Sequence, residues 1–278
     1  MKNTRDISLH LRLVGSLRDI AERAIALQLP FFQCFLVIKS SGNIIRPTTE
    51  DVQDFIALRR QHFGALYVHG SYWINLAGIV HNGHHALERE LRMAKRLEFT
   101  HMILHPGSAK GALHKDQGID ALAKTLNKVL KWEQHIKIVL ENSAHGALSI
   151  GGDLQDFAQL LAKLDHPEKL LFCVDTAHAY SYGYDIAQAV EREKFIQLLD
   201  TTIGISRIAL IHLNDTSEIC GSKIDKHAST GTGRIGKEAL KAFMLDARLA
   251  SIPVLMELPV LPEDQEQIIL DQVRSWHT

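Results

Sequence analysis

The sequence has little of what marks secreted, membrane-spanning or disulfide-stabilised proteins. Its three cysteines, Cys34, Cys173 and Cys220, are widely spaced and odd in number, so we expect reduced thiols rather than a disulfide framework. The absence of a CxxC pair also argues against thiolate zinc sites. No apolar run approaches the roughly 18 residues that cross a bilayer, and the N-terminus has no apolar signal-peptide core. We therefore expect a cytoplasmic protein with no membrane partner.

Charge of one sign and aromatic side chains are also scarce. The formal net charge is -1 at pH 7, so the chain has no overall basic field that would attract nucleic acid. Aromatic residues make up 6% of the sequence, which does not suggest a stacking platform for single strands. Any attraction to DNA must therefore be local. Histidine is the residue in excess, with 16 copies among 278 residues.

Short apolar runs alternate with longer segments of helical period, the pattern of repeated βα units. A (β/α)₈ barrel needs about 250 residues, so residues 1–278 are predicted to form a single TIM-barrel domain of the α/β class with eight strands and eight helices. The predicted strands are Ile7–Val14, Phe31–Val37, Leu66–His69, His101–His105, Ile136–Glu141, Leu170–Asp175, Arg207–His212 and Ile252–Glu257.

Two of the intervening segments have particularly clear helical signals. Residues 84–98 place Leu87, Leu91, Ala94 and Leu97 on one face. In residues 47–60, Thr48 and Asp51 could form a capping box at the start of the helix.

The last six predicted strands all end in a residue type that binds metals. These ends are His69, His105, Glu141, Asp175, His212 and Glu257. Because all strands of a parallel barrel point the same way, their C-terminal ends surround one mouth, and six such residues should converge there. A single histidine or acid at a strand end is more often an ordinary loop residue. The shared position of all six favours a metal site.

Three further candidates lie in loops that leave the same ends of strands. They are His178, in the segment DTAH, and Asp225 and His227, in SKIDKH. Nitrogen and carboxylate ligands without thiolates suit catalytic zinc, with manganese chemically possible. The remaining eleven histidines, including those in HNGHH at 81–85, are expected to be helix, loop or packing residues.

The order and residues of the motifs in this sequence resemble those of the endonuclease IV family of DNA-repair enzymes. From about residue 65 onward, the motifs are HGSYWINLA (69–77), HPGS (105–108), LENSA (140–144), DTAHAYSYGYD (175–185), HLND (212–215) and GSKIDKH followed by GTGRIG (221–236). All nine positions at which that family binds three zinc ions carry the family's residue type.

The resemblance implies both the metal assignment and the reaction. His69 and His105 would hold one zinc, Asp175, His212 and Glu257 a second, and His178, Asp225 and His227 a third, with Glu141 bridging the first two. Glu141, Glu257 and His105 are the expected catalytic members. Zinc lowers the pKa of bound water toward about 7, so hydroxide could attack the phosphodiester 5′ to an abasic site in double-stranded DNA. We expect a monomer that needs no nucleotide cofactor.

The DNA-gripping segments match the family less closely. Tyr72 and Trp73 stand where relatives insert bulky side chains into the duplex, although an aromatic pair can equally pack on a neighbouring loop. After the second strand, relatives carry a polar and basic run, whereas VIKSSGNIIRP offers Lys39 and Arg46. Lys226 replaces the usual Arg, which keeps the charge but loses a bidentate grip on phosphate. Gly231, Gly233 and Gly236 fit a loop that approaches a phosphate, a weak signal because glycine is common in turns.

Three other functions remain open from the sequence. Glu141, Asp175, His212 and Glu257 also form the metal quartet of xylose isomerase-like barrels that isomerise or epimerise sugars. The other five ligand-type residues favour phosphate chemistry, since a sugar isomerase has no need of them. A zinc hydrolase of another phosphate ester and a DNA-damage-binding module without turnover are the remaining alternatives.

Overall fold

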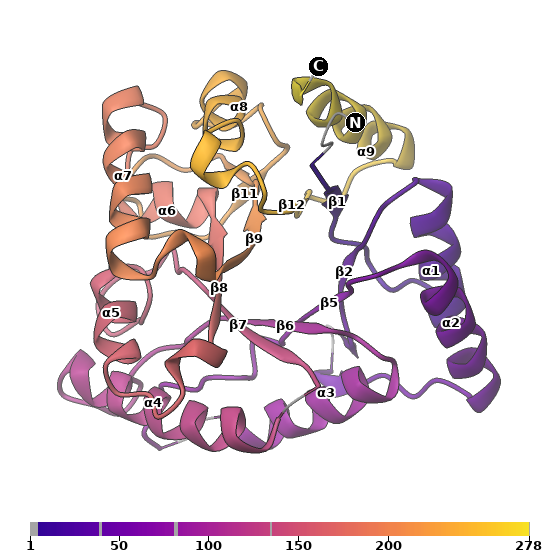
Figure 1. Ribbon diagram of the computed structural model, residues 1–278, viewed down its shortest axis with the longest axis horizontal. Coiled ribbons are helices and arrows are strands. Elements are labelled where there is room, and N and C mark those ends of the chain that lie inside the picture. The colour runs from indigo at the N-terminus through magenta and orange to yellow at the C-terminus, as the bar shows by residue number, and fades with distance from the viewer. Residues whose placement is uncertain (1–4, 39–40, 81–82, 134, 278) are drawn as a thin grey trace.

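Eight parallel strands form a barrel that is ringed by helices (Figure 1). The computed structural model describes residues 5–38, 41–80, 83–133 and 135–277. The strands are hydrogen-bonded in the order β1-β12-β9-β8-β7-β6-β5-β2, as the predicted fold requires. Their bounds are β1 (Ile7–Leu9), β2 (Gln33–Phe35), β5 (Tyr67–His69), β6 (His101–Leu104), β7 (Lys137–Glu141), β8 (Leu171–Asp175), β9 (Ile208–His212) and β12 (Val254–Met256).

The barrel closes where its first and last strands in that order, β1 and β2, meet. Among the described residues, these two strands are joined by one parallel bridge between His10 and Gln33. The Leu11 amide donates to the Gln33 carbonyl oxygen at 2.8 Å. We call this junction the seam. It is narrower than the neighbouring contacts, since β1 pairs with β12 over three residue pairs.

Nine α-helices lie in the described part of the chain, one more than predicted. The additional helix is α6, which follows β8 directly and is itself followed by α7. The α-helices are α1 (Leu17–Ala26), α2 (Thr49–His62), α3 (His84–Arg96), α4 (Lys115–Trp132), α5 (Gln155–Leu161), α6 (Thr176–Tyr182), α7 (Ala189–Thr202), α8 (Lys237–Met244) and α9 (Glu263–Arg274). Short 3₁₀ helices are η1 (Pro167–Lys169), η2 (Ile205–Arg207), η3 (Ala247–Leu249) and η4 (Ser275–His277). Within these described ranges, no helix combines the length and apolar character that a membrane crossing needs.

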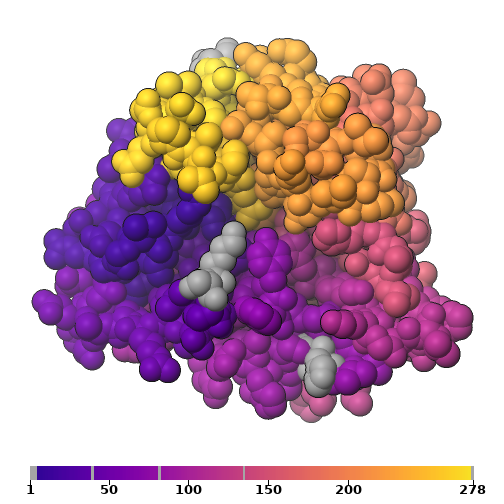
Figure 2. All heavy atoms as spheres, turned by 180° about the vertical axis from the view of Figure 1, so that it is seen from behind, coloured from indigo at the N-terminus to yellow at the C-terminus, as the bar shows by residue number. Residues whose placement is uncertain are grey.

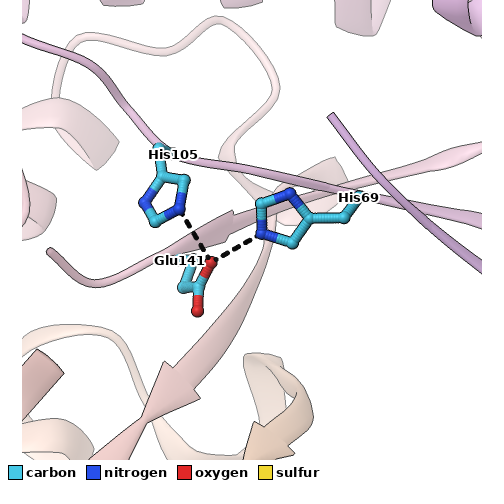
Figure 3. A group of neighbouring side chains, drawn as sticks. All are labelled: His69, His105 and Glu141. Atoms are coloured by element: carbon cyan, nitrogen blue, oxygen red, sulfur yellow. Dashed lines mark hydrogen bonds and ion pairs between the residues drawn. The ribbon is translucent and has the colours of Figure 1, made fainter. Parts of the chain in front are cut away.

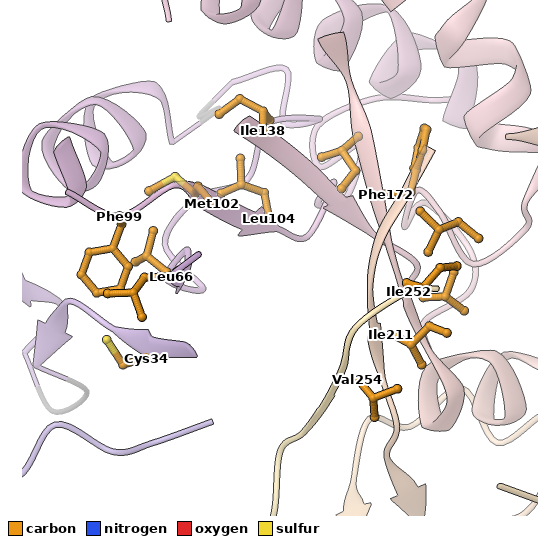
Figure 4. Packing of buried hydrophobic residues seen from close by; sticks show 14 of the residues in the cluster. Cys34, Leu66, Phe99, Met102, Leu104, Ile138, Phe172, Ile211, Ile252 and Val254 are labelled. Atoms are coloured by element: carbon orange, nitrogen blue, oxygen red, sulfur yellow. The ribbon is translucent and has the colours of Figure 1, made fainter. Parts of the chain in front are cut away.

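The main hydrophobic core lies between the strands and the helices. Leu87, Leu91 and Ala94 of α3 are fully buried there, which confirms the predicted apolar face. Figure 4 shows part of this core, in which Phe172 and Ile211 of neighbouring strands lie among other apolar side chains. A second, smaller cluster is formed by Phe31, Tyr67, Ile103, Val139, Cys173, Leu210 and Leu255.

Two local predictions at the N-terminal end of the chain need correction. The first strand ends at Leu9 rather than Val14, because the chain beyond the seam turns away to form part of the pocket described below. Thr48 caps α2 as predicted, but Asp51 does not complete a capping box. The Asp51 carboxylate instead accepts from the amides of Leu17 and Arg18, at the start of α1. It thus satisfies amides that the first turn of α1 leaves without a partner.

Two short antiparallel strand pairs lie in the loops that follow the barrel strands. The first is the hairpin of β3 (Val37–Ile38) and β4 (Asn43–Ile44), which we call the rim hairpin. The second pairs β10 (Asp215–Thr216) with β11 (His227–Ala228). Figure 2 looks onto this side of the molecule, which is hollowed near its centre.

Candidate metal centre

The predicted strand-end residues converge at the bottom of a pocket. His69, Glu141, Asp175 and His212 are the last residues of their strands, whereas His105 and Glu257 lie one residue past theirs. The pocket has a volume of about 640 Å³. Its polar wall includes His10, His69, His105, His178, Asp225, His227 and Glu257.

Glu141 is the centre of the first half of this cluster. It is fully buried, and its Oε2 lies 3.2 Å from His69 Nε2 and 3.6 Å from His105 Nε2 (Figure 3). Its other oxygen, Oε1, lies 2.8 Å from His212 Nδ1 and 3.5 Å from His178 Nδ1. One carboxylate therefore faces four imidazoles from four separate parts of the chain.

The second half of the cluster gathers around Asp175 and Asp225. Helix α6 places His178 one turn after Asp175, and His178 Nε2 lies 3.2 Å from Asp225 Oδ1. His227 Nε2 is 3.4 Å from the same Asp225 oxygen and 3.6 Å from Asp175 Oδ2. Glu257 Oε2 lies 3.5 Å from His212 Nδ1 and 3.9 Å from His227 Nδ1 and so joins the two halves. The structure thus brings together all nine residues predicted as ligands.

Three of the imidazoles are oriented by a contact between one ring nitrogen and a carbonyl or amide oxygen. His69 Nδ1 lies 2.8 Å from the Gly70 carbonyl oxygen, and His178 Nδ1 lies 2.9 Å from that of Asn142. His212 Nε2 lies 3.0 Å from Gln33 Oε1. Since these oxygens accept, each nitrogen there carries the proton, as is usual for metal-binding histidines.

In the neutral ring, the other nitrogen of each carries a lone pair that faces a carboxylate oxygen. Two lone pairs repel each other unless a proton or a cation lies between them. His178 Nε2 and His227 Nε2 are also buried without a hydrogen-bond partner among the described groups, although an Asp225 oxygen is near both. Buried polar atoms rarely lack a partner. These residues therefore fit bound cations.

The buried carboxylates and imidazoles of the cluster shift one another's pKa values. Burial raises the pKa of Glu141, but the imidazoles of His212 and His105 outweigh it and hold that pKa well below its usual range. Burial lowers the pKa of His105 to about 4, so this imidazole stays neutral near pH 7. Burial also acts to lower the pKa of His178, but the Asp175 carboxylate and its neighbours reverse the shift and raise that pKa well above the usual value.

Four overlapping groups of side chains have ligand atoms within 4.8 Å of one another. Three consist of imidazoles and carboxylates: His69 with His105 and Glu141; Glu141 with Asp175, His212 and Glu257; and Asp175 with His178 and His227. The fourth consists of Glu141, Cys173 and His212. Burial raises the pKa of the Cys173 thiol to about 12, so it keeps its proton and is a poor ligand.

Several polar residues that support the ligands were not predicted. The Asn214 amide donates to Asp175 Oδ2 at 2.6 Å and accepts from the Glu257 amide at 2.8 Å. The Asn142 side chain accepts from the Asp175 amide at 2.7 Å. Both asparagines lie just after a ligand, within motifs quoted above, and that position was the available signal. Gln33 and His10 at the seam also contact ligands.

Asp215 organises the glycine-rich loop that precedes α8. Its buried carboxylate accepts from the backbone amides of five residues, at distances between 2.8 and 3.2 Å: Thr216, Gly231, Gly233, Ile235 and Gly236. A Cβ at Gly233 would lie 2.5 Å from Asp215 Oδ1, so glycine is required there. The amides of these three glycines thus already have an acceptor, which argues against direct amide contacts to a phosphate, and the approach of this loop to a phosphate stays a prediction.

The residues predicted to contact DNA are spread around the mouth. Tyr72 is 72% exposed, and its ring lies nearly parallel to that of His105 at 6.2 Å. Trp73 is 65% exposed and packs on the rim hairpin, where its indole leaves no room for a Cβ at Gly42. Lys226 is exposed, 3.7 Å from Glu218 Oε1, and Arg46 is exposed after β4. Lys39 lies outside the described residues.

Comparisons with known proteins agree with this geometry. The family model described as "Xylose isomerase-like TIM barrel" matches residues 26–277. "Probable endonuclease 4" of Halorhodospira halophila is 33% identical over 276 residues, covering 95% of this chain and 91% of that protein. "Apurinic-apyrimidinic endonuclease" of Caenorhabditis elegans is 29% identical, covering 96% of this chain and 69% of that protein. The crystal structure of endonuclease IV from Thermus thermophilus superposes with a TM-score of 0.84 at 30% identity, covering 98% of both chains.

Proposed function

The chain belongs to the endonuclease IV family of xylose isomerase-like TIM barrels, and from this membership we propose that it is a metal-dependent endonuclease that hydrolyses DNA on the 5′ side of abasic sites. One structural observation carries the proposal. Nine imidazole and carboxylate side chains meet at and just beneath the floor of an open pocket, and His69, His178 and His212 each direct one ring nitrogen at a carboxylate oxygen.

We assign three zinc ions to this pocket, with manganese chemically possible at one position. His69, His105 and Glu141 would hold the first, and Asp175, His212 and Glu257, together with Glu141, the second. His178, Asp225 and His227 would hold the third, with Asp175 beside it. When bound, zinc supplies a Lewis acid for the phosphoryl oxygens and lowers the pKa of water toward about 7.

The chain's own residues supply position and charge. Glu141 spans the first two groups, with one oxygen toward His69 and the other toward His212, and thereby fixes how far apart those groups lie. Glu257, at the edge of the pocket, and His105 complete the predicted catalytic set. Four carboxylates cannot neutralise three divalent ions, so the filled pocket would keep a positive charge that attracts one phosphodiester. This local charge replaces the overall basic field that the sequence lacks.

Tyr72 stands between the pocket and solvent, beside His105. We propose that it fills space in the duplex next to the missing base, as bulky side chains do when they unstack a base step. We further propose that the chain acts as a cytoplasmic, single-domain monomer without a nucleotide cofactor. Light scattering should then give a mass near 31.2 kDa, and a dimer mass would contradict the monomer.

The direct test uses a duplex that carries one tetrahydrofuran abasic analogue. This analogue cannot undergo β-elimination, so any nick must come from hydrolysis. Zinc-loaded wild type should cut on the 5′ side of the analogue, whereas Glu141→Gln should lose at least about a thousandfold in rate, because oxyanion and metal chemistry of this kind contributes several kcal/mol. The exposed Glu238, in the first turn of α8, offers a matched control, and Glu238→Gln should cut like wild type.

The outcomes separate the remaining functions. No cutting by zinc-loaded wild type would overturn the endonuclease proposal. In that case, three zinc ions per chain would indicate another phosphate ester as substrate, and two would favour the sugar chemistry of the wider superfamily. Tight binding of the abasic duplex without cutting would indicate a damage-binding module.

A further inference from the structure

Gln33 is a fully buried polar residue at the seam, and its side chain lies inside the barrel against two members of the ligand cluster. Its Oε1 lies 3.0 Å from His212 Nε2, and its Nε2 donates to Glu257 Oε1 at 2.7 Å. The same Nε2 lies 2.9 Å from His10 Nδ1. The amide therefore connects strand β2 with β9, with the residue after β12 and with the residue after β1.

Both protons and the oxygen of the Gln33 side-chain amide have a partner in these contacts. The two protons on Nε2 are directed at Glu257 and His10, and Oε1 accepts from His212. The opposite orientation of the amide would place its oxygen against the Glu257 carboxylate, where two acceptors repel. The Gln33 amide is therefore oriented with Nε2 toward Glu257 and Oε1 toward His212.

The consequence for the cluster lies on the far side of the His212 ring. Because Oε1 of Gln33 accepts from Nε2, the proton of a neutral His212 is on Nε2, and Nδ1 is left unprotonated. That nitrogen lies 2.8 Å from Glu141 Oε1 and 3.5 Å from Glu257 Oε2. Gln33 thus fixes both the tautomer of one ligand and the position of one oxygen of another.

We propose that Gln33 is a positioning residue for the metal centre, which prepares His212 and Glu257 for the cation that they share with Glu141 and Asp175. Partners of this kind orient the ligands that bind a metal directly, and their loss typically costs about 10- to 100-fold in metal affinity. His10, the residue after β1, supports Gln33 in turn, with its ring packed on Phe35 at 4.8 Å. The proposal rests on the metal centre of the proposed function but not on its substrate.

A purely structural role is the competing explanation. Gln33 also forms the bridge that closes the seam, so its replacement could lower stability without affecting metal binding. The backbone makes that bridge, however, and the side chain makes the contacts to the ligands. Variants that change the side chain alone can therefore separate the two roles.

The test compares Gln33→Met with Cys34→Ala. Methionine keeps the length of the side chain but offers no strong donor or acceptor. Cys34 is the next residue of β2, is equally buried, and packs in the core outside the barrel (Figure 4). Zinc content and affinity are measured by competition with a chelator, and the thermal midpoint is measured with and without zinc. Gln33→Met should lose about 10- to 100-fold in affinity for one ion, while Cys34→Ala binds zinc like wild type at a lowered midpoint.

Wild-type zinc affinity in a folded Gln33→Met would overturn the proposal and leave Gln33 as a seam residue. So would the absence of zinc binding by the wild type. If Gln33→Met does not fold, Gln33→Asn keeps an amide that is one methylene too short to reach both ligands, and it should weaken the same ion. Loss of zinc in these variants without any cutting of abasic DNA by the wild type would support the role of Gln33 and contradict the proposed substrate.

Discussion

The bottom of the pocket and its rim are built in opposite ways. At the bottom, Glu141, Asp175 and His212 are fully buried, and each has a hydrogen-bonding partner in another strand or loop. At the rim, Tyr72 is 72% exposed and Ile38 is 50% exposed. The wall that the rim hairpin and the segment after β1 present to the pocket is largely apolar, with Leu11, Val37 and Ile45 among its members.

The difference teaches which part of the site the barrel itself determines. Neighbouring strands lie about 4.8 Å apart, so side chains at their ends must come close together whatever the loops do. The rim hairpin is held by two residue pairs and can change without disturbing that arrangement. We infer that metal chemistry is fixed by the scaffold, while the grip on DNA is set by loops and here relies on apolar contact more than on charge.

The largest loss of stability is expected at Asp215, which holds the glycine-rich loop and lies in the strand that pairs with His227. Asp215→Asn leaves one acceptor oxygen for five backbone amides and turns an amide group toward them, so we expect a loss of about 3 kcal/mol in the free energy of unfolding. Strand β10 pairs Thr216 with His227, so affinity at the third metal position should fall as well. Denaturant unfolding and zinc content measure the two effects.

Asp246 provides a matched control for Asp215. It caps the amide of Arg248 on the surface and pairs with the Arg248 guanidinium. Asp246→Asn should therefore cost no more than about 1 kcal/mol and leave zinc content unchanged. Equal losses in the two variants would show that the Asp215 carboxylate is not the anchor of the loop.

A smaller effect is expected at the rim. Tyr72→Ala should weaken binding of the abasic duplex about tenfold, since a base-step or stacking contact is worth about 1–3 kcal/mol, and should leave zinc content unchanged. Binding is measured in the Glu141→Gln background, so that the duplex is not cut. A change in zinc content would mean that Tyr72 belongs to the bottom of the pocket through its contact with His105, and the comparison would fail.

The smallest expected effects are changes in how strongly DNA affinity depends on salt concentration. If the rim grips DNA with few cations, Lys226→Ala should reduce the slope of log affinity against log salt by about 0.9, and Ile38→Arg should raise it by about the same amount. Both slopes are obtained by titrating the abasic duplex at several salt concentrations. Unchanged slopes in both variants would place the phosphate contacts elsewhere.

The sequence predicted the barrel and the convergence of the nine candidate ligands for a physical reason. Apolar runs alternate with amphipathic helices over the whole chain, and the barrel turns six distant strand ends into neighbours. The ends are accurate to one residue, as His105 and Glu257 show. The helix α6 was missed because DTAHAYSYGYD is short and has no amphipathic period, although it places His178.

Supporting residues had no comparable signal. Gln33 is a single polar residue within an apolar run, and His10 fits an exposed position of an alternating strand. Asp215 resembles a surface acid at the start of a loop, yet it is fully buried. The role of Gln33 depends on partners 179 and 224 residues away, and that of Asp215 on five backbone amides, and neither can be deduced from the local sequence pattern.

The seam is the weakest junction between neighbouring strands of the barrel. With one bridge joining β1 to β2 among the described residues, transient opening should begin there, and the Leu11 amide should exchange its hydrogen for deuterium sooner than amides in the middle of β7 or β8. Glu257 and His212 both contact Gln33, a residue of the seam. A cation held by these two ligands would therefore also stabilise the closed seam. Ligand binding to the closed form shifts the opening equilibrium by mass action, so metal loading should slow exchange at the seam more than anywhere else in the barrel.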